Sequence, residues 1–200
     1  MKVIRLFWLF LLIVSCKLGH EQEKPFPIIL QKDQVECGPT CLQMVSRYYG
    51  VDYDIELLNK LSNLRAEGTS MGDIASAADI IGLKNLAIKI DYETLLNEVP
   101  YPAMLHWNGN HFVLVYKMDR DSIWIADPAK GAITYAKEEF LPNWIVQDST
   151  NMVEEGYALV FEATGKFYKA TTKIKARLQS DVKAKKQDSI LLSNSLIDER

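Results

Sequence analysis

The hydrophobic pattern of this chain changes character once, near Pro100, and that change limits the fold more than any other feature. Before Pro100 the apolar residues recur at helical spacing. After it they fall in short runs separated by Asn, Gly, Asp and Pro. We expect helices over residues 38–49, 55–61, 71–81 and 92–98, and strands over residues 103–107, 111–117, 122–126, 132–135 and 157–162. Helices followed by a set of strands indicate an α+β domain, with N-terminal helices packed on an antiparallel sheet.

Residues at the helix ends support these boundaries. Asp54 and Ser70 stand where the second and third helices need a side-chain acceptor for their first N–H groups. Gly50 and Gly82 follow the first and third helices, where a left-handed residue commonly ends a helix.

Composition divides the 200 residues into three parts. Residues 25–166 are mixed and rich enough in apolar side chains to bury one sizeable core, so we expect one folded domain there. Residues 1–24 are predicted to be an export segment followed by a polar tether. Residues 167–200 are polar and lysine-rich, which favours a partly helical or disordered tail.

The first sixteen residues have the pattern of a secretion signal. Lys2 and Arg5 precede an unbroken apolar run from residue 6 to residue 14, which is short for a membrane span. The run ends in Ile-Val-Ser-Cys16, which resembles the lipobox of bacterial lipoproteins, in which the cysteine is lipidated. The alternative is an uncleaved N-terminal anchor. Both predict membrane association through the N-terminus, with the rest of the chain outside the cytoplasm.

Charge and cysteine content exclude several classes of function. The net charge is −3 and no basic stripe is present, so a nucleic-acid partner is disfavoured. Three cysteines, at positions 16, 37 and 41, are too few for a disulfide framework, and no Cys-x-x-Cys pair marks a zinc site. Each cysteine must therefore be considered singly.

Cys37 is the first candidate for chemistry, because it stands where the first helix begins. The partial positive charge of a helix N-terminus and a neighbouring imidazolium both stabilise a thiolate. Gly38 leaves the backbone open to a substrate carbonyl, and Pro39 suits the first turn of a helix. A buried, inert cysteine is the alternative and the commoner fate of a single Cys.

His111 and Asp127 provide a partner for that thiol. His111 opens one predicted strand and Asp127 follows the next. If the hairpin between them turns at residues 119–120, Asp127 lies opposite His111, close enough for the carboxylate to hold one imidazole nitrogen while the other faces the thiol. A structural His–Asp hydrogen bond is the alternative. Gln31, six residues before Cys37, is a candidate amide donor for an oxyanion, although a surface glutamine would fit its position as well.

These residues carry a resemblance to a known family. The segments Gln31-Lys-Asp-Gln-Val-Glu-Cys37-Gly-Pro-Thr-Cys41, Asn110-His111-Phe-Val-Leu-Val and Ala126-Asp127-Pro-Ala-Lys-Gly131 are similar, in order, to the three signatures of the bacteriocin-processing, double-glycine-leader cysteine peptidases. Those peptidases usually form the N-terminal domain of peptide-exporting ABC transporters. The likeness spans about residues 25–166.

The resemblance implies a papain-like cysteine peptidase fold and a role for each residue. Cys37 would be the nucleophile, His111 the general base, Asp127 the group that orients His111, and Gln31 a donor in the oxyanion hole. It implies no metal and no organic cofactor, and its substrate would be a peptide or leader peptide. Cys41 matches a second, non-catalytic family cysteine and is expected in the core. His106 is expected to be structural or to line a groove.

Two departures from the family pattern keep other functions open. The sequence contains no nucleotide-binding phosphate loop and no second long apolar segment, so we expect a peptidase without transporter or ATPase modules. The family's peptidase domains face the cytoplasm, which remains the alternative to export. A non-hydrolytic module that binds a leader peptide is the second hypothesis. A subunit acting with a separately encoded ABC transporter is the third.

Overall fold

The chain begins its described part with helices whose ends follow local sequence rules. The computed structural model describes residues 25–146, 154–169 and 172. The first helices are α2 (Cys37–Tyr48), α3 (Ile55–Leu61) and α4 (Met71–Ile81). Asp54 accepts a hydrogen bond from the N–H of Glu56, and Ser70 accepts one from the N–H of Asp73, so both predicted caps are confirmed. Gly82 ends α4 in the left-handed conformation, with φ of 90°.

The second half supplies most of a six-stranded sheet. Its strands are β1 (Leu83–Asp91), β2 (Ala103–Trp107), β3 (His111–Met118), β4 (Ile123–Asp127), β5 (Gly131–Tyr135) and β6 (Glu155–Ala163). They lie in the order β1-β6-β2-β3-β4-β5, and every neighbouring pair is antiparallel. Two short helices, α5 (Tyr92–Asn97) and α6 (Lys137–Trp144), connect strands. The predicted α+β class is confirmed.

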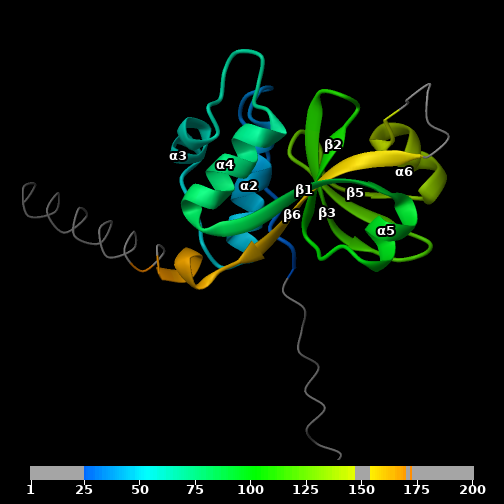
Figure 1. Ribbon diagram of the computed structural model, residues 1–200. Helices are drawn as coiled ribbons and strands as arrows, with labels where there is room; N and C mark the ends of the chain where they lie inside the picture. The colour runs from blue at the N-terminus through cyan, green and yellow to red at the C-terminus, as the bar shows by residue number, and fades with distance from the viewer. Residues whose placement is uncertain (1–24, 147–153, 170–171, 173–200) are drawn as a thin grey trace, which may run out of the picture.

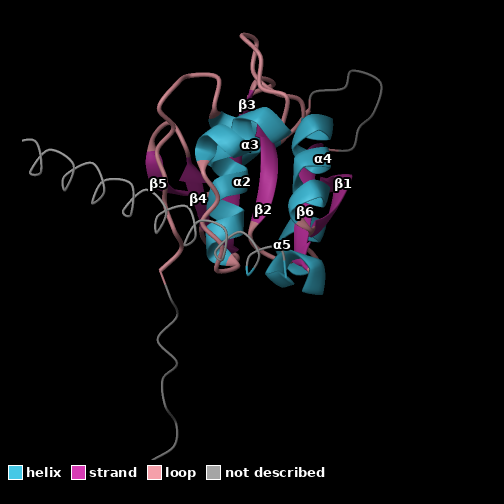
Figure 2. Cartoon of the chain, turned by 90° about the vertical axis from the view of Figure 1, so that its left-hand side faces the viewer, coloured by secondary structure: helices cyan, strands magenta, loops and turns pink. Residues whose placement is uncertain are grey.

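The sheet separates two hydrophobic cores. Helices α2, α3 and α4 gather on one side of the molecule, and α5 and α6 lie on the other (Figure 1). Turned by 90°, α2, α3 and α4 stand in front of the strands (Figure 2). Successive residues of a strand point to opposite faces, so Phe112 and Leu114 of β3 join the core under α2, whereas Val113 and Val115 join the core under α5 and α6.

Two elements lie where the sequence predicted none. Strand β1 is an edge strand in which Lys84, Asn85 and Lys89 interrupt the apolar alternation, and it pairs with β6 over its whole length. Helix α6 contains Pro142 near its end, and its first turn is held by Glu139, which accepts a hydrogen bond from the N–H of Ala136 at 3.0 Å. Both elements depend on contacts that local patterns do not carry.

The packed core continues beyond the predicted domain boundary at residue 166. Residues 165–169 are helical, and the side chain of Phe167 is fully buried against the rings of Tyr49 and Tyr53. The predicted export segment, including Cys16, and nearly all of the predicted tail lie outside the described residues. Among the residues that are described, no helix is long and apolar enough to cross a bilayer.

We predict that Phe167→Ala lowers the free energy of unfolding by about 3–5 kcal/mol, because it leaves a cavity in the core beneath α2. Its neighbour Tyr168 is half exposed and provides the matched control. Tyr168→Ala should change stability by less than about 1 kcal/mol. Urea denaturation followed by tryptophan fluorescence measures both. Equal effects of the two substitutions would show that Phe167 does not belong to the core.

Candidate active site

Cys37 is the first residue of α2, so its side chain lies where the helix presents free N–H groups and partial positive charge. The thiol is 7% exposed. It forms hydrogen bonds with the His111 side chain and with the backbone N–H groups of Phe112 and Gly38. Burial raises the pKa of the Cys37 thiol, but these hydrogen bonds and the His111 charge outweigh burial, so the pKa lies below its ordinary value.

Gly38 has a packing role as well as the predicted one. A Cβ atom built on Gly38 would lie 2.6 Å from Cδ1 of Ile74 and 2.6 Å from Cγ2 of Thr69. The absence of a side chain therefore lets the start of α2 approach α4 closely. This contact was not predicted from the sequence.

His111 is held between the thiol and a carboxylate. Its Nε2 lies 2.8 Å from Oδ1 of Asp127, which leaves Nδ1 for the sulfur of Cys37. The His111 side chain is 20% exposed and the Asp127 side chain 2%. Burial lowers the pKa of His111, but hydrogen bonds to Asp127 and Cys37 and their negative charges raise it to about 9. The arrangement favours an imidazolium beside a thiolate.

Asp127 keeps its charge although it is buried. Burial raises its pKa, and the hydrogen bonds from His111 and from the N–H of Ala129, the latter 2.8 Å long, lower it further than burial raises it. The pKa of Asp127 therefore lies below its ordinary value, and the carboxylate remains an acceptor for the imidazole.

The contact between His111 and Asp127 was predicted, but the strand register behind it was wrong. The observed pairs are Leu114 with Ala126 and Val115 with Ile125, which by continuation set Asp127 level with Val113. The pairing shifts between Val115 and Lys117, at an irregularity typical of a β-bulge. Because the error is two residues, both side chains still share one face of the sheet, and they meet as diagonal neighbours.

Gln31 lies beside the Asp127 loop. Its backbone N–H donates to the carbonyl of Pro128 at 2.8 Å, so the segment before α2 is tied to the residue after Asp127. Its side-chain amide donates to the carbonyl of Asp33 at 2.8 Å, which leaves a second amide proton. The buried Oε1 of Gln31 has no hydrogen-bond partner within the part of the chain that the structure describes.

Glu36 is the residue that the sequence analysis missed. It is 6% exposed, and its carboxylate accepts hydrogen bonds from the N–H groups of Lys32 (3.1 Å) and Asp33 (3.2 Å) and from the Asn59 amide (2.7 Å). Burial raises the pKa of Glu36, but these bonds lower it below its ordinary value. Glu36 thus closes the loop that carries Gln31 and leads into Cys37. An acidic residue immediately before a helix was the only sequence signal.

Cys41 and His106 occupy the places expected for structural residues. Cys41 is fully buried and unpaired in a disulfide, and its thiol donates to the carbonyl of Phe112 at 3.4 Å. Burial raises the pKa of Cys41 well above its ordinary value, so it stays protonated. His106 packs on the ring of Phe112 and lines a second cavity with Asn108 and Tyr157.

Comparison with known proteins places this geometry in a family. The model of the Peptidase C39 family matches residues 25–149. The chain belongs to the Peptidase C39 family. This is a family of cysteine peptidases, so the chain carries a cysteine peptidase domain, similar to peptidases that process double-glycine leaders.

Two related proteins show how far the C39 likeness extends. The lactococcin-G-processing and transport ATP-binding protein LagD of Lactococcus lactis subsp. lactis is 37% identical over 122 residues, which cover 58% of this chain and 17% of LagD. The probable functional amyloid protease FapD of Pseudomonas fluorescens is 30% identical over 143 residues, which cover 66% of this chain and 63% of FapD. The chain thus matches less than two thirds of either relative.

Solved structures of the C39 family confirm the papain-like fold. A double glycine motif protease from an AMS/PCAT transporter, crystallised with a leader peptide, superposes with a TM-score of 0.60 at 30% identity over 69% of this chain and 91% of that one. The peptidase domain of Streptococcus ComA gives a TM-score of 0.61 at 27% identity, over 70% of this chain and 99% of that one.

We predict that iodoacetamide labels Cys37 rapidly at a pH well below the ordinary thiol pKa, because the lowered pKa of Cys37 keeps it a thiolate there. In His111→Ala the cation is lost, so the pH midpoint of labelling should rise and the rate at pH 7 should fall. Mass spectrometry locates the label. Cys41 is the internal control, and labelling of Cys41 in preference to Cys37 would contradict the assignment.

We also predict that Glu36→Gln lowers the free energy of unfolding by about 1.5–3 kcal/mol, because the charged acceptor of three hydrogen bonds becomes a neutral amide. Glu67→Gln, at an exposed position, is the matched control and should have little effect. Chemical denaturation at neutral pH measures both. If the two variants unfold alike, Glu36 does not hold the loop.

Proposed function

We propose that this chain is a cysteine endopeptidase in which Cys37, His111 and Asp127 form the catalytic triad. The observation that carries the proposal is the buried thiol at the start of α2, hydrogen-bonded to an imidazole whose Nε2 lies 2.8 Å from a buried carboxylate. A nucleophile, a base and an orienting group within hydrogen-bond reach of one another are what acyl transfer by a thiol requires.

The reaction follows from these positions. The Cys37 thiolate attacks the peptide carbonyl, and the oxygen of the tetrahedral intermediate accepts hydrogen bonds from the Cys37 N–H and from the free amide proton of Gln31. His111 gives its proton to the leaving amine, and a thioester remains on Cys37. His111 then takes a proton from water, which attacks the thioester and releases the acid. Asp127 holds the imidazole in place throughout.

The substrate class we propose is a peptide precursor, cut after a pair of glycines. Support comes from the related proteins, whose descriptions name lactococcin G processing and a double glycine motif protease bound to a leader peptide. A separately encoded ABC transporter is a proposed partner, and attachment to the membrane through the N-terminal segment is the proposed location. A non-hydrolytic peptide-binding module remains the second candidate, because the relative bound to a leader peptide shows that this fold also grips peptides.

We predict that the full-length chain cleaves a synthetic peptide with a central Gly-Gly pair, and that Cys37→Ala abolishes cleavage. Gln31→Ala should lower kcat by a factor of about 10²–10³, because one oxyanion donor is lost. Gln34→Ala, an exposed glutamine in the same loop, is the matched control and should retain full activity.

The pH profile of kcat/KM gives an independent check. Cleavage should decline on the alkaline side near pH 9, where His111 loses its proton, and on the acid side below the ordinary thiol pKa, where Cys37 gains one. Peptide binding without cleavage in both wild type and Cys37→Ala would refute the peptidase and support the binding module.

A further inference from the structure

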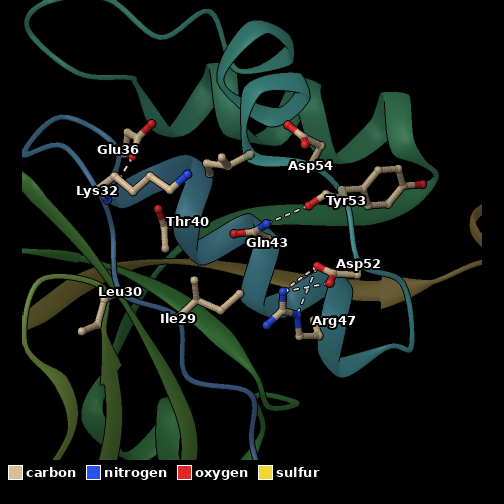
Figure 3. A pocket seen from close by; sticks show the side chains of 11 residues that line it. Ile29, Leu30, Lys32, Glu36, Thr40, Gln43, Arg47, Asp52, Tyr53 and Asp54 are labelled. Atoms are coloured by element: carbon tan, nitrogen blue, oxygen red, sulfur yellow. Dashed lines mark hydrogen bonds and ion pairs between the residues drawn. The ribbon is translucent and has the colours of Figure 1, made fainter. Parts of the chain in front are cut away.

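A cavity of about 510 Å³ lies against α2 and has no role in the triad (Figure 3). One wall is the segment 29–32, the opposite wall is the loop 52–55, and the floor is the face of α2 that carries Thr40, Gln43 and Arg47. These helical positions are three or four residues apart and therefore share one face. The cavity adjoins Glu36, the residue before Cys37.

The acidic side chains that line this cavity are already occupied as acceptors. Asp52 accepts two hydrogen bonds from Arg47, of 2.7 and 2.9 Å from Nη2 to its two oxygens, and the two charges pair. Asp54 caps α3 by accepting from the N–H of Glu56 at 2.7 Å. Glu36 accepts its three hydrogen bonds from Lys32, Asp33 and Asn59.

The groups left over are hydrogen-bond donors. The Thr40 side chain is 1% exposed, and its Oγ1 has no partner among the residues described. Figure 3 shows the Lys32 side chain reaching across the cavity above Thr40, and its ammonium makes no ion pair with any side chain in the described ranges. A buried hydroxyl without a partner is uncommon in native proteins and points to a ligand that completes it.

We propose that this cavity binds an acidic side chain of the peptide substrate, with its carboxylate held by the Lys32 ammonium and the Thr40 hydroxyl. Both groups donate, so a carboxylate satisfies both at once and forms a charge-assisted hydrogen bond with Lys32. Ile29, Leu30 and Ile55 line the same cavity and suit the methylene groups of such a side chain.

The position of the cavity favours a peptide over a free acid. Lys32 follows Gln31 directly, and its backbone N–H donates to Glu36, so the cavity wall and the catalytic loop are one segment of chain. A residue bound there is held by the same loop that leads into Cys37. The assignment rests on the proposed function only in taking a peptide as the ligand.

The test measures binding without turnover, in the full-length chain carrying Cys37→Ala. Lysines are acetylated with acetic anhydride and quantified by mass spectrometry, with and without acetyl-Ala-Glu-Ala-Ala-amide or its Gln and Arg counterparts. Lys60, exposed on α3, is the internal control. We expect the Glu peptide to protect Lys32 selectively, at a concentration at least about fivefold below that of the Gln peptide, because only the Glu side chain is charged.

Thr40→Val provides the matched variant. Valine has the shape of threonine, and replacing a hydroxyl that has no partner should leave the melting temperature unchanged or raise it. The concentration of Glu peptide needed to protect Lys32 should nevertheless rise by about three- to tenfold, because one hydrogen bond to the carboxylate is lost. Unchanged protection in a folded Thr40→Val chain would remove Thr40 from the site.

The remaining outcomes distinguish an acidic peptide from other ligands of the cavity. Equal protection by the Glu and Gln peptides, or better protection by the Arg peptide, would overturn the acidic preference. Protection by glutarate at the same concentration as the Glu peptide would overturn the peptide as occupant. If wild type cleaves peptides but Lys32 is never protected, this site fails and the proposed function stands. If the Glu peptide protects Lys32 selectively but wild type cleaves no peptide, the site stands and the proposed function fails.

Discussion

The backbone of Phe112 joins the helical layer to the sheet at the point where the chemistry is placed. Its N–H contacts the sulfur of Cys37, and its carbonyl accepts from the thiol of Cys41 one helical turn later. The first turn of α2 is therefore fixed against the first residues of β3. His111 immediately precedes Phe112, so its imidazole reaches the sulfur without any long or flexible connection.

Each buried polar group in this region is stabilised by the next one. The thiol is drawn toward ionisation by the imidazole, the imidazole is kept protonated by Asp127, and Asp127 is kept charged by the imidazole and by the N–H of Ala129. The chain of interactions ends on a backbone dipole, so no further buried charge is required. Removing any one member leaves its neighbours in a less polar environment without a partner, which is why the pKa shifts of Cys37 and His111 belong to the pair.

Local features of the sequence predicted much of this fold, and long-range contacts account for what they missed. The caps Asp54 and Ser70 act on their own first turns, so they are visible in a short window of sequence. Strand β1 is held mainly by pairing with β6, more than sixty residues later, and its lysines hide the alternation. The bulge between Val115 and Lys117 shifts the register in a way that turn position alone could not reveal.

The candidate site was predictable to the same extent. Cys37 and His111 stand at element boundaries that the sequence marks, and the predicted contact of His111 with Asp127 survived a register error of two residues because an even shift preserves the face. Glu36 was missed because its importance arises from Asn59 of α3, which approaches it only in the fold. The donors above Thr40 likewise come together from separate segments.

The sealed position of Cys41 determines how the chain responds to an oxidant. Oxidation of an accessible thiolate gives a sulfenic acid, which a nearby second thiol usually captures as a disulfide. Cys41 is one helical turn from Cys37, but its sulfur is fully buried and directed at the carbonyl of Phe112, and it stays protonated. Within the described residues Cys37 therefore has no resolving thiol, and recovery from oxidation depends on a reductant supplied from outside the fold.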